Sequence, residues 1–184
     1  MEHVSGKFIP FYDVWSAFRE PGQLVPLWQN VRPMMFGDLL AHVTMVKKYG
    51  PRDYRYRLLG SEVNLKMGDD PVGEDFFKYL PKHLHDYAYK WLDKIVAQPC
   101  AAWHEMSLEF ANNKSRRYES LNLPIRGTHG EIDTFLYFNK GWQPQPGENL
   151  GPLLSSGAEF FTIEPVDVGA GIPDTAPLLK AAKL

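Results

Sequence analysis

The chain has 184 residues, enough for one domain with a hydrophobic core and too few for a second independent core to be expected. Its composition, 44% hydrophobic, 14% aromatic and 23% charged, is globular and excludes a chain that is disordered as a whole. The formal net charge is -2 and the 20 basic residues are spread along the sequence, so nucleic acid is not an expected partner.

A single cysteine, Cys100, excludes an internal disulfide and metal sites built from several cysteines, and it fits a reducing compartment. The first residues lack the long apolar run of a secretory signal. No stretch approaches the roughly 18 consecutive apolar residues that a membrane span needs. We therefore expect a cytoplasmic protein that does not bind a membrane.

The first half of the sequence predicts a helix, two strands and a series of short helices. Phe11, Trp15 and Phe18 recur at helical spacing and form one apolar stripe. Ser61 can cap a short helix, because its hydroxyl accepts from backbone N–H groups that lack a partner in the first turn. The expected elements are a helix over 11–20, a short helix over 34–40, strands over 42–49 and 54–59, a short helix over 61–67 and a helical turn within 72–80.

The second half predicts one long helix followed by three strands. Apolar side chains recur along 82–97 at spacings of three and four residues, which is the clearest amphipathic pattern in the chain. Turn residues join the three strands into an antiparallel meander. These strands are expected over 101–110, 117–125 and 132–140. From Gly141 onward prolines and glycines accumulate, although 158–168 has the composition of a strand.

This order of elements predicts an α+β fold. Two strands before the helical segment and three after it make a five-stranded antiparallel sheet, and no parallel crossover is required. We expect helices on one face of the sheet, together with the N-terminal helix. The domain is expected to span 1–142, followed by a Pro/Gly-rich C-terminal extension over 143–184.

Several short sequence motifs follow one another along the chain. Residues 12–15 read Tyr-Asp-Val-Trp, residues 39–43 read Leu-Leu-Ala-His-Val, and residues 54–61 read Tyr-Arg-Tyr-Arg-Leu-Leu-Gly-Ser. Met-Gly and Val-Gly pairs stand at 67–68 and 72–73, and Asn-Leu-Pro-Ile stands at 122–125. In this order and spacing the sequence resembles a bacterial, mainly alphaproteobacterial, single-domain PAS family over residues 11–142.

The resemblance implies a PAS-type sensory module that acts in signal transduction by binding a small molecule, a protein partner or both. In this fold the concave sheet and the helices enclose a small-molecule pocket, and the N-terminal helix often forms a dimer. The resemblance supplies no catalytic residues, so we expect no enzyme. We expect the signal to pass to a separate signalling protein.

The candidate pocket residues are apolar and aromatic side chains from the helices and strands that would face each other. Aromatic walls with a few polar tips suit a small apolar or aromatic ligand, whereas the alternative is that these rings only fill the core. The expected lining is Phe76, Phe77, Leu80, Leu84 and Trp91 from helical segments and Tyr56, Trp103, Tyr118, Leu121 and Tyr137 from strands.

The last expected strand, over 132–140, carries apolar side chains on both faces. Only one of these faces can line the pocket, so the other needs a cover. The helix that carries Phe11, Trp15 and Phe18 is the natural cover, from its own chain or from a partner chain. On this basis we predict a homodimer with these three residues at the interface.

PAS domains that carry haem or a flavin adduct need particular residues in their helices. His83 and His85 stand near the start of the helix over 82–97, where haem-binding members place an axial ligand. The two side chains point about 200° apart on a helix, so they do not hold a metal jointly, and surface histidines are the favoured interpretation. The flavin adduct of other members needs a cysteine on the helix after the second strand, and 61–67 contains none. We therefore expect no metal site and no flavin adduct.

Two other functions stay open at this point. A cone-shaped α+β enzyme of the ketosteroid-isomerase type would use an aspartate or histidine in an aromatic pocket as a base. In that fold the helices come first, whereas here two strands are expected before the longest helix. A haem-based sensor is the other alternative, and it would show a Soret band.

Overall fold

A computed structural model describes residues 6–67, 70–141, 153–154 and 159–175 of the chain. Its strands are β1 (Val43–Gly50), β2 (Asp53–Leu59), β3 (Cys100–Glu109), β4 (Ser115–Arg126), β5 (Ile132–Gly141) and β6 (Glu159–Asp167). Within the described residues they form one six-stranded antiparallel sheet in the order β2-β1-β5-β4-β3-β6. The fold is α+β, with β5 and β4 at the centre of the sheet.

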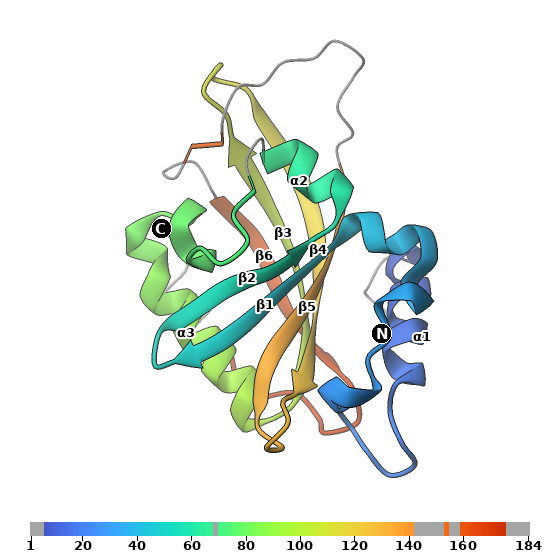
Figure 1. The fold of residues 1–184 in the computed structure, drawn as a ribbon. Coiled ribbons are helices and arrows are strands. Elements are labelled where there is room, and N and C mark those ends of the chain that lie inside the picture. The colour runs from blue at the N-terminus through green and yellow to red at the C-terminus, as the bar shows by residue number, and fades with distance from the viewer. Residues whose placement is uncertain (1–5, 68–69, 142–152, 155–158, 176–184) are drawn as a thin grey trace.

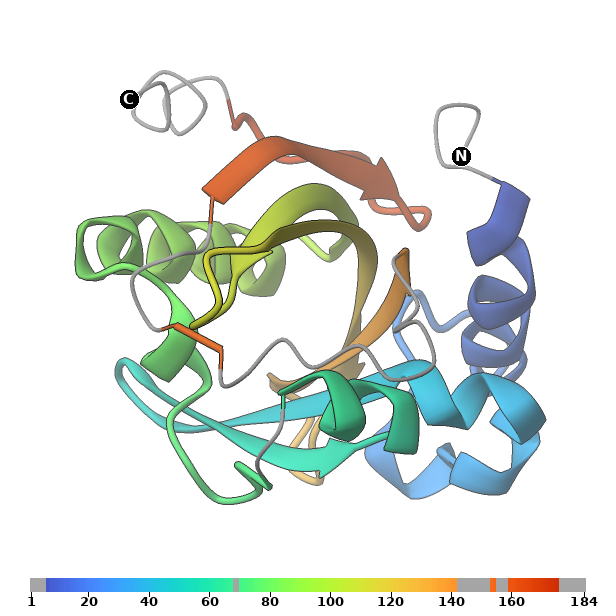
Figure 2. The same ribbon diagram turned by 90° about the horizontal axis from the view of Figure 1, so that it is seen from above.

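The helical elements lie on both sides of this sheet (Figures 1 and 2). They are the α-helices α1 (Ile9–Ala17), α2 (Ser61–Met67) and α3 (Lys82–Ala97) and the 3-10 helices η1 (Gly6–Phe8), η2 (Trp28–Asn30), η3 (Pro33–His42) and η4 (Phe76–Tyr79). We call the face that packs toward α3 the inner face and the face that packs toward α1 the outer face. Each face has its own hydrophobic cluster.

The outer cluster is closed by α1. The rings of Phe11 and Phe138 stack with centroids 4.8 Å apart, and the indole Nε1 of Trp15 donates to the backbone oxygen of Pro124 at 2.9 Å. Phe11 and Trp15 are fully buried, as are Leu123 of β4 and the Phe138 ring of β5. The apolar stripe of α1 therefore covers the sheet of its own chain.

Most of the predicted elements are confirmed to within a few residues. The helices expected over 61–67 and 82–97 coincide with α2 and α3, and the expected strands correspond to β1 through β5. The short helix expected over 34–40 belongs to η3, a 3-10 run interrupted at Gly37, where φ is 51°.

The prediction of five strands is wrong, because a sixth strand pairs with β3. Strand β6 follows β3 from the Cys100–Asp167 pair to the Ser107–Glu159 pair. It satisfies backbone groups that would otherwise be exposed along the edge of β3. The strand-like composition of 158–168 is thus realised within the main sheet, and most of the rest of 143–184 lies outside the described residues.

Gly60 fixes the junction between β2 and α2. Its N–H donates to the backbone oxygen of Val43 at 2.7 Å, and a Cβ atom at this position would lie 2.2 Å from the backbone oxygen of Leu40. Only glycine allows this approach of two backbones. The Leu-Gly-Ser end of the motif at 54–61 therefore sets where α2 begins.

Because Trp15 is fully buried and hydrogen-bonded, we expect Trp15→Ala to lower the free energy of unfolding by about 3 to 5 kcal/mol. Trp15→Phe keeps most of the packing and loses the hydrogen bond, which costs about 1 to 2 kcal/mol. Urea unfolding of both variants measures these losses. Trp28→Ala is the control, because Trp28 is 39% exposed. Equal losses for Trp15→Ala and Trp28→Ala would contradict the described packing.

Candidate functional site

A cavity of about 180 Å³ lies between the inner face of the sheet and the helices α2, η4 and α3. The helical side contributes Leu80, Tyr87 and Trp91, and the sheet contributes Met106 and Ile163 among others. The amphipathic stripe of α3 faces this layer, with Trp91 and Leu92 buried on it. An engineered apolar cavity of about 150 Å³ is known to hold benzene, so this space fits one small ring.

A polar group stands on the sheet side of the cavity. Asn122 of β4 lines the cavity and is 2% exposed, and its Oδ1 atom has no hydrogen-bond partner among the described residues. The hydroxyl of Ser120, on the same face two residues earlier, is likewise buried without a partner there. A buried acceptor without a donor costs about 1 to 3 kcal/mol, which a bound donor would offset.

Three tyrosines of the cavity wall keep their protons. Burial raises the pKa of Tyr56, Tyr118 and Tyr137 above the usual value of a phenol. The hydroxyl of Tyr56 donates to the backbone oxygen of Phe76 at 3.4 Å, and that of Tyr118 contacts the sulfur of Met106 at 2.6 Å. The tyrosines therefore present neutral O–H groups in a largely apolar wall.

His104 of β3 lies between two of these rings. Its imidazole centroid is 6.4 Å from the Tyr118 ring and 6.2 Å from the Tyr137 ring. Burial lowers the pKa of His104 to about 4, so the imidazole is neutral at pH 7. A neutral imidazole has one donor and one acceptor nitrogen, and it adds polarity without charge.

Of the predicted lining residues, seven line the cavity: Tyr56, Phe76, Phe77, Leu80, Trp91, Tyr118 and Tyr137. Leu84 is buried in the same hydrophobic cluster but does not reach the cavity. That these side chains bind a ligand stays a prediction.

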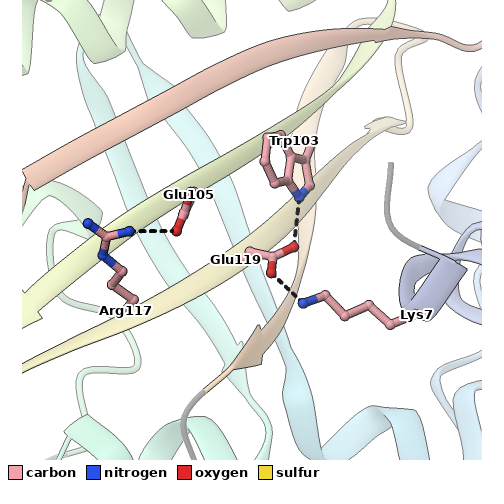
Figure 3. A network of polar contacts seen from close by, with 5 residues as sticks. All are labelled: Lys7, Trp103, Glu105, Arg117 and Glu119. Atoms are coloured by element: carbon pink, nitrogen blue, oxygen red, sulfur yellow. Dashed lines mark hydrogen bonds and ion pairs between the residues drawn. The ribbon is translucent and has the colours of Figure 1, made fainter. Parts of the chain in front are cut away.

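Trp103 and Leu121 point to the outer face, which corrects their predicted place. They are opposite each other in the β3–β4 pairing, and directly opposed side chains share a face. The indole of Trp103 donates to Glu119 Oε2 at 3.3 Å, and the Lys7 ammonium contacts the same carboxylate (Figure 3). Both strands carry apolar residues on both faces, so alternation alone does not identify the inner one.

The three predicted interface residues are buried inside the chain. Phe11 and Trp15 are fully buried and Phe18 is 4% exposed, all within the outer cluster. In this arrangement they are not available to a partner chain, so a dimer interface built on them is not supported. The prediction that this helix covers the second apolar face of the sheet is confirmed by the packing of α1.

The histidines considered for haem do not fit that role. His83 is exposed, and Nε2 of His85 lies 2.8 Å from the backbone oxygen of Leu80. Neither residue is among the described lining of the cavity. Across the described residues, no group of three or more His, Cys, Asp or Glu side chains is placed to hold a metal ion.

Cys100 is placed for packing rather than for reaction. It is buried at the start of β3, and burial raises the pKa of its thiol to about 12. A thiol with a raised pKa is a poor nucleophile and a poor metal ligand. In α2, where a flavin adduct would need a cysteine, the sequence has none.

Sequence reasoning missed the polar and basic lining. Asn122 and His104 were not identified as pocket residues, and neither were Lys66 and Arg116. One signal was present, because Asn122 is four residues from Tyr118 on a strand and therefore on the same face. For Lys66 no such signal exists, since its position depends on how α2 packs.

A protein-family model described as PAS domain matches residues 1–138. The chain belongs to the PAS domain family. The match covers all of β1 through β4 and most of β5, so the resemblance of the motifs is confirmed. Curated proteins yield no match to this sequence.

Solved structures with a similar fold include several light-oxygen-voltage domains. One, studied with a flavin analogue, has a TM-score of 0.42 and 9% identity, over 55% of this PAS chain and 76% of its own. The Rhodobacter sphaeroides LOV protein has a TM-score of 0.44 and 12% identity, over 76% and 70%. VqmA bound to DPO has a TM-score of 0.38 and 10% identity, over 54% and 51%. Likenesses of this degree do not identify a ligand for this PAS domain.

The buried His104 makes the stability of the PAS domain depend on pH. Unfolded histidine takes up a proton near pH 6.5, whereas folded His104 does so only near pH 4. The unfolded state thus binds more protons in this window, so the free energy of unfolding falls as the pH drops from 6.5 to 4, by roughly 3 kcal/mol. Urea unfolding at several pH values measures this slope.

His104→Gln is expected to flatten the slope between pH 6.5 and 4, because glutamine does not titrate. His83→Gln is the matched control, since His83 is exposed on α3. An unchanged slope in His104→Gln would contradict a neutral, buried His104.

Proposed function

We propose that this PAS domain is a sensory module whose cavity binds a small apolar or aromatic molecule and whose bound and free states differ in affinity for a separate signalling protein. The observation that carries the proposal is the apolar cavity with the buried, unpartnered Asn122 Oδ1 in its described wall. An empty site of this kind loses both packing and a hydrogen bond. A small ligand with one donor restores both.

A non-enzymatic role fits the chemistry of the described lining. The low pKa of His104 makes it a weak base, and the thiol of Cys100 is held in its protonated form. A ketosteroid-isomerase-like enzyme would need a base tuned near neutral pH. In addition, β1 and β2 precede the longest helix, α3, in contrast to the helix-first order of that fold.

A cytoplasmic location and a homodimer are further parts of the proposal. None of the helices in the described ranges has the length and apolar run needed to cross a bilayer. Since α1 packs on its own sheet, a dimer would use a surface other than Phe11, Trp15 and Phe18. Light scattering at micromolar concentration decides between one copy and two.

The ligand-binding role predicts a co-purifying small molecule. We expect native mass spectrometry of fresh protein to show an added mass that disappears under denaturing conditions. Ala88→Leu, on the cavity side of α3, fills the space and is expected to abolish the added mass while the protein stays folded.

Ala97→Leu makes the same change at an exposed position of α3 and should retain the added mass. If Ala88→Leu carries the same added mass as the wild type, the molecule does not occupy the cavity. If repeated preparations of wild type carry none, a pure protein-interaction role replaces the ligand-sensing role.

A further inference from the structure

Two buried polar groups belong to opposite walls of the cavity. Tyr87 of α3 lines it on the helical side and is 7% exposed, and its hydroxyl oxygen has no hydrogen-bond partner among the described residues. Asn122 of β4 lines it on the sheet side, and its Oδ1 atom likewise lacks a partner there. Each wall therefore carries one polar atom that the described part of the chain leaves unpaired.

The two groups need different partners. Burial raises the pKa of Tyr87 to about 12, so its hydroxyl keeps its proton at pH 7 and can donate. The side-chain oxygen of Asn122 can only accept. An unpaired polar atom in an apolar surrounding costs free energy. A molecule that brings both an acceptor and a donor removes both costs.

The space beside these groups is apolar and fits one ring. In the strand register Asn122 is flanked by Ala102 on β3 and by Tyr137 on β5. On the helical side Trp91 follows Tyr87 by about one turn of α3 and is also buried. The volume of about 180 Å³ accommodates one ring with a short substituent.

The basic side chains of the described wall do not require an anion. Arg117 forms an ion pair on the outer face (Figure 3). The ammonium of Lys140 stands 5.5 Å from the ring centroid of Phe138, which belongs to the outer cluster. The other two basic members, Lys66 and Arg116, are also engaged in interactions. Since the described lining contains no aspartate or glutamate, it offers no counter-charge to a cation either.

We propose that the ligand of this cavity is a neutral one-ring molecule with a hydrogen-bond donor next to an acceptor, as in an aromatic carboxamide. Its N–H donates to Asn122 Oδ1, its C=O accepts from the Tyr87 hydroxyl, and its ring lies beside Trp91. A carboxamide suits both walls, because one of its N–H bonds points away from its C=O. This inference rests on the proposed ligand-binding function and adds the chemical class and the orientation of the ligand.

Three probes of nearly the same size and shape separate the two hydrogen bonds. Benzamide has the donor and the acceptor, acetophenone has only the acceptor, and isopropenylbenzene has neither. Two nearly isosteric variants, Tyr87→Phe and Asn122→Leu, each remove one of the two protein groups. Chemical-shift titration of protein freed of any co-purified molecule measures the dissociation constants.

Tyr87→Phe is expected to weaken benzamide and acetophenone by about fivefold relative to isopropenylbenzene, the factor that one neutral hydrogen bond supplies. Asn122→Leu is expected to weaken benzamide by a similar factor relative to the other two probes. Without ligand, both variants should unfold at a urea concentration no lower than wild type, because each loses a buried atom that lacks a partner among the described residues.

Tyr49→Phe is the matched control, because it removes the same hydroxyl at a position that is 51% exposed, and it should change no affinity. If each substitution affects the three probes equally, or affects none of them, enclosed water or other groups satisfy the two atoms and the proposed class is overturned while the cavity function stands. Binding of none of the probes would also overturn the class, and the added-mass comparison of Ala88→Leu with Ala97→Leu would then decide the cavity function separately.

Discussion

The central strands must be shielded from water on both faces, and the rest of the molecule follows from this constraint. Along β4 and β5 the side chains alternate, so Leu123 and Phe138 face one way while Asn122 and Tyr137 face the other. The outer face is covered by α1, whose Phe11 ring stacks on Phe138. The inner face is covered by α3 together with the short elements α2 and η4, and there a cavity remains. The two coverings therefore have different roles: one closes the sheet and the other leaves room for a ligand.

The inner face combines a largely apolar cavity wall with two buried polar atoms, Asn122 Oδ1 and the Ser120 hydroxyl oxygen, that have no hydrogen-bond partner among the described residues. Asn122 Oδ1 is a fixed acceptor, the tyrosine hydroxyls stay protonated, and His104 stays neutral. Buried polar atoms in a native core normally have hydrogen-bond partners. Their lack of partners beside the cavity lowers the stability of the fold and leaves an acceptor available to a bound ligand.

How much of this could be read from the sequence depended on the range of the interactions involved. The helix over 82–97 and the meander strands were predictable, because their apolar periodicity is local. The inner face was not, since Trp103 and Tyr118 sit on strands that are apolar on both sides and only the packing of α3 chooses between them. The pairing of β6 with β3 and the approach of Lys66 to Lys140 join segments far apart in the chain, and no local pattern encodes them.

Xenon binding to protein freed of any co-purified molecule, followed by methyl chemical shifts, tests the asymmetry of the two faces most directly. Xenon enters apolar cavities that lack a resident group and perturbs the methyl groups around them. The account predicts saturable shifts for the methyl groups of Met106, Leu108 and Ile163, with none for Leu123 and Leu136 on the closed outer face. Shifts of equal size on both faces, or none on the inner face, would contradict a cavity confined to the α3 side of the sheet.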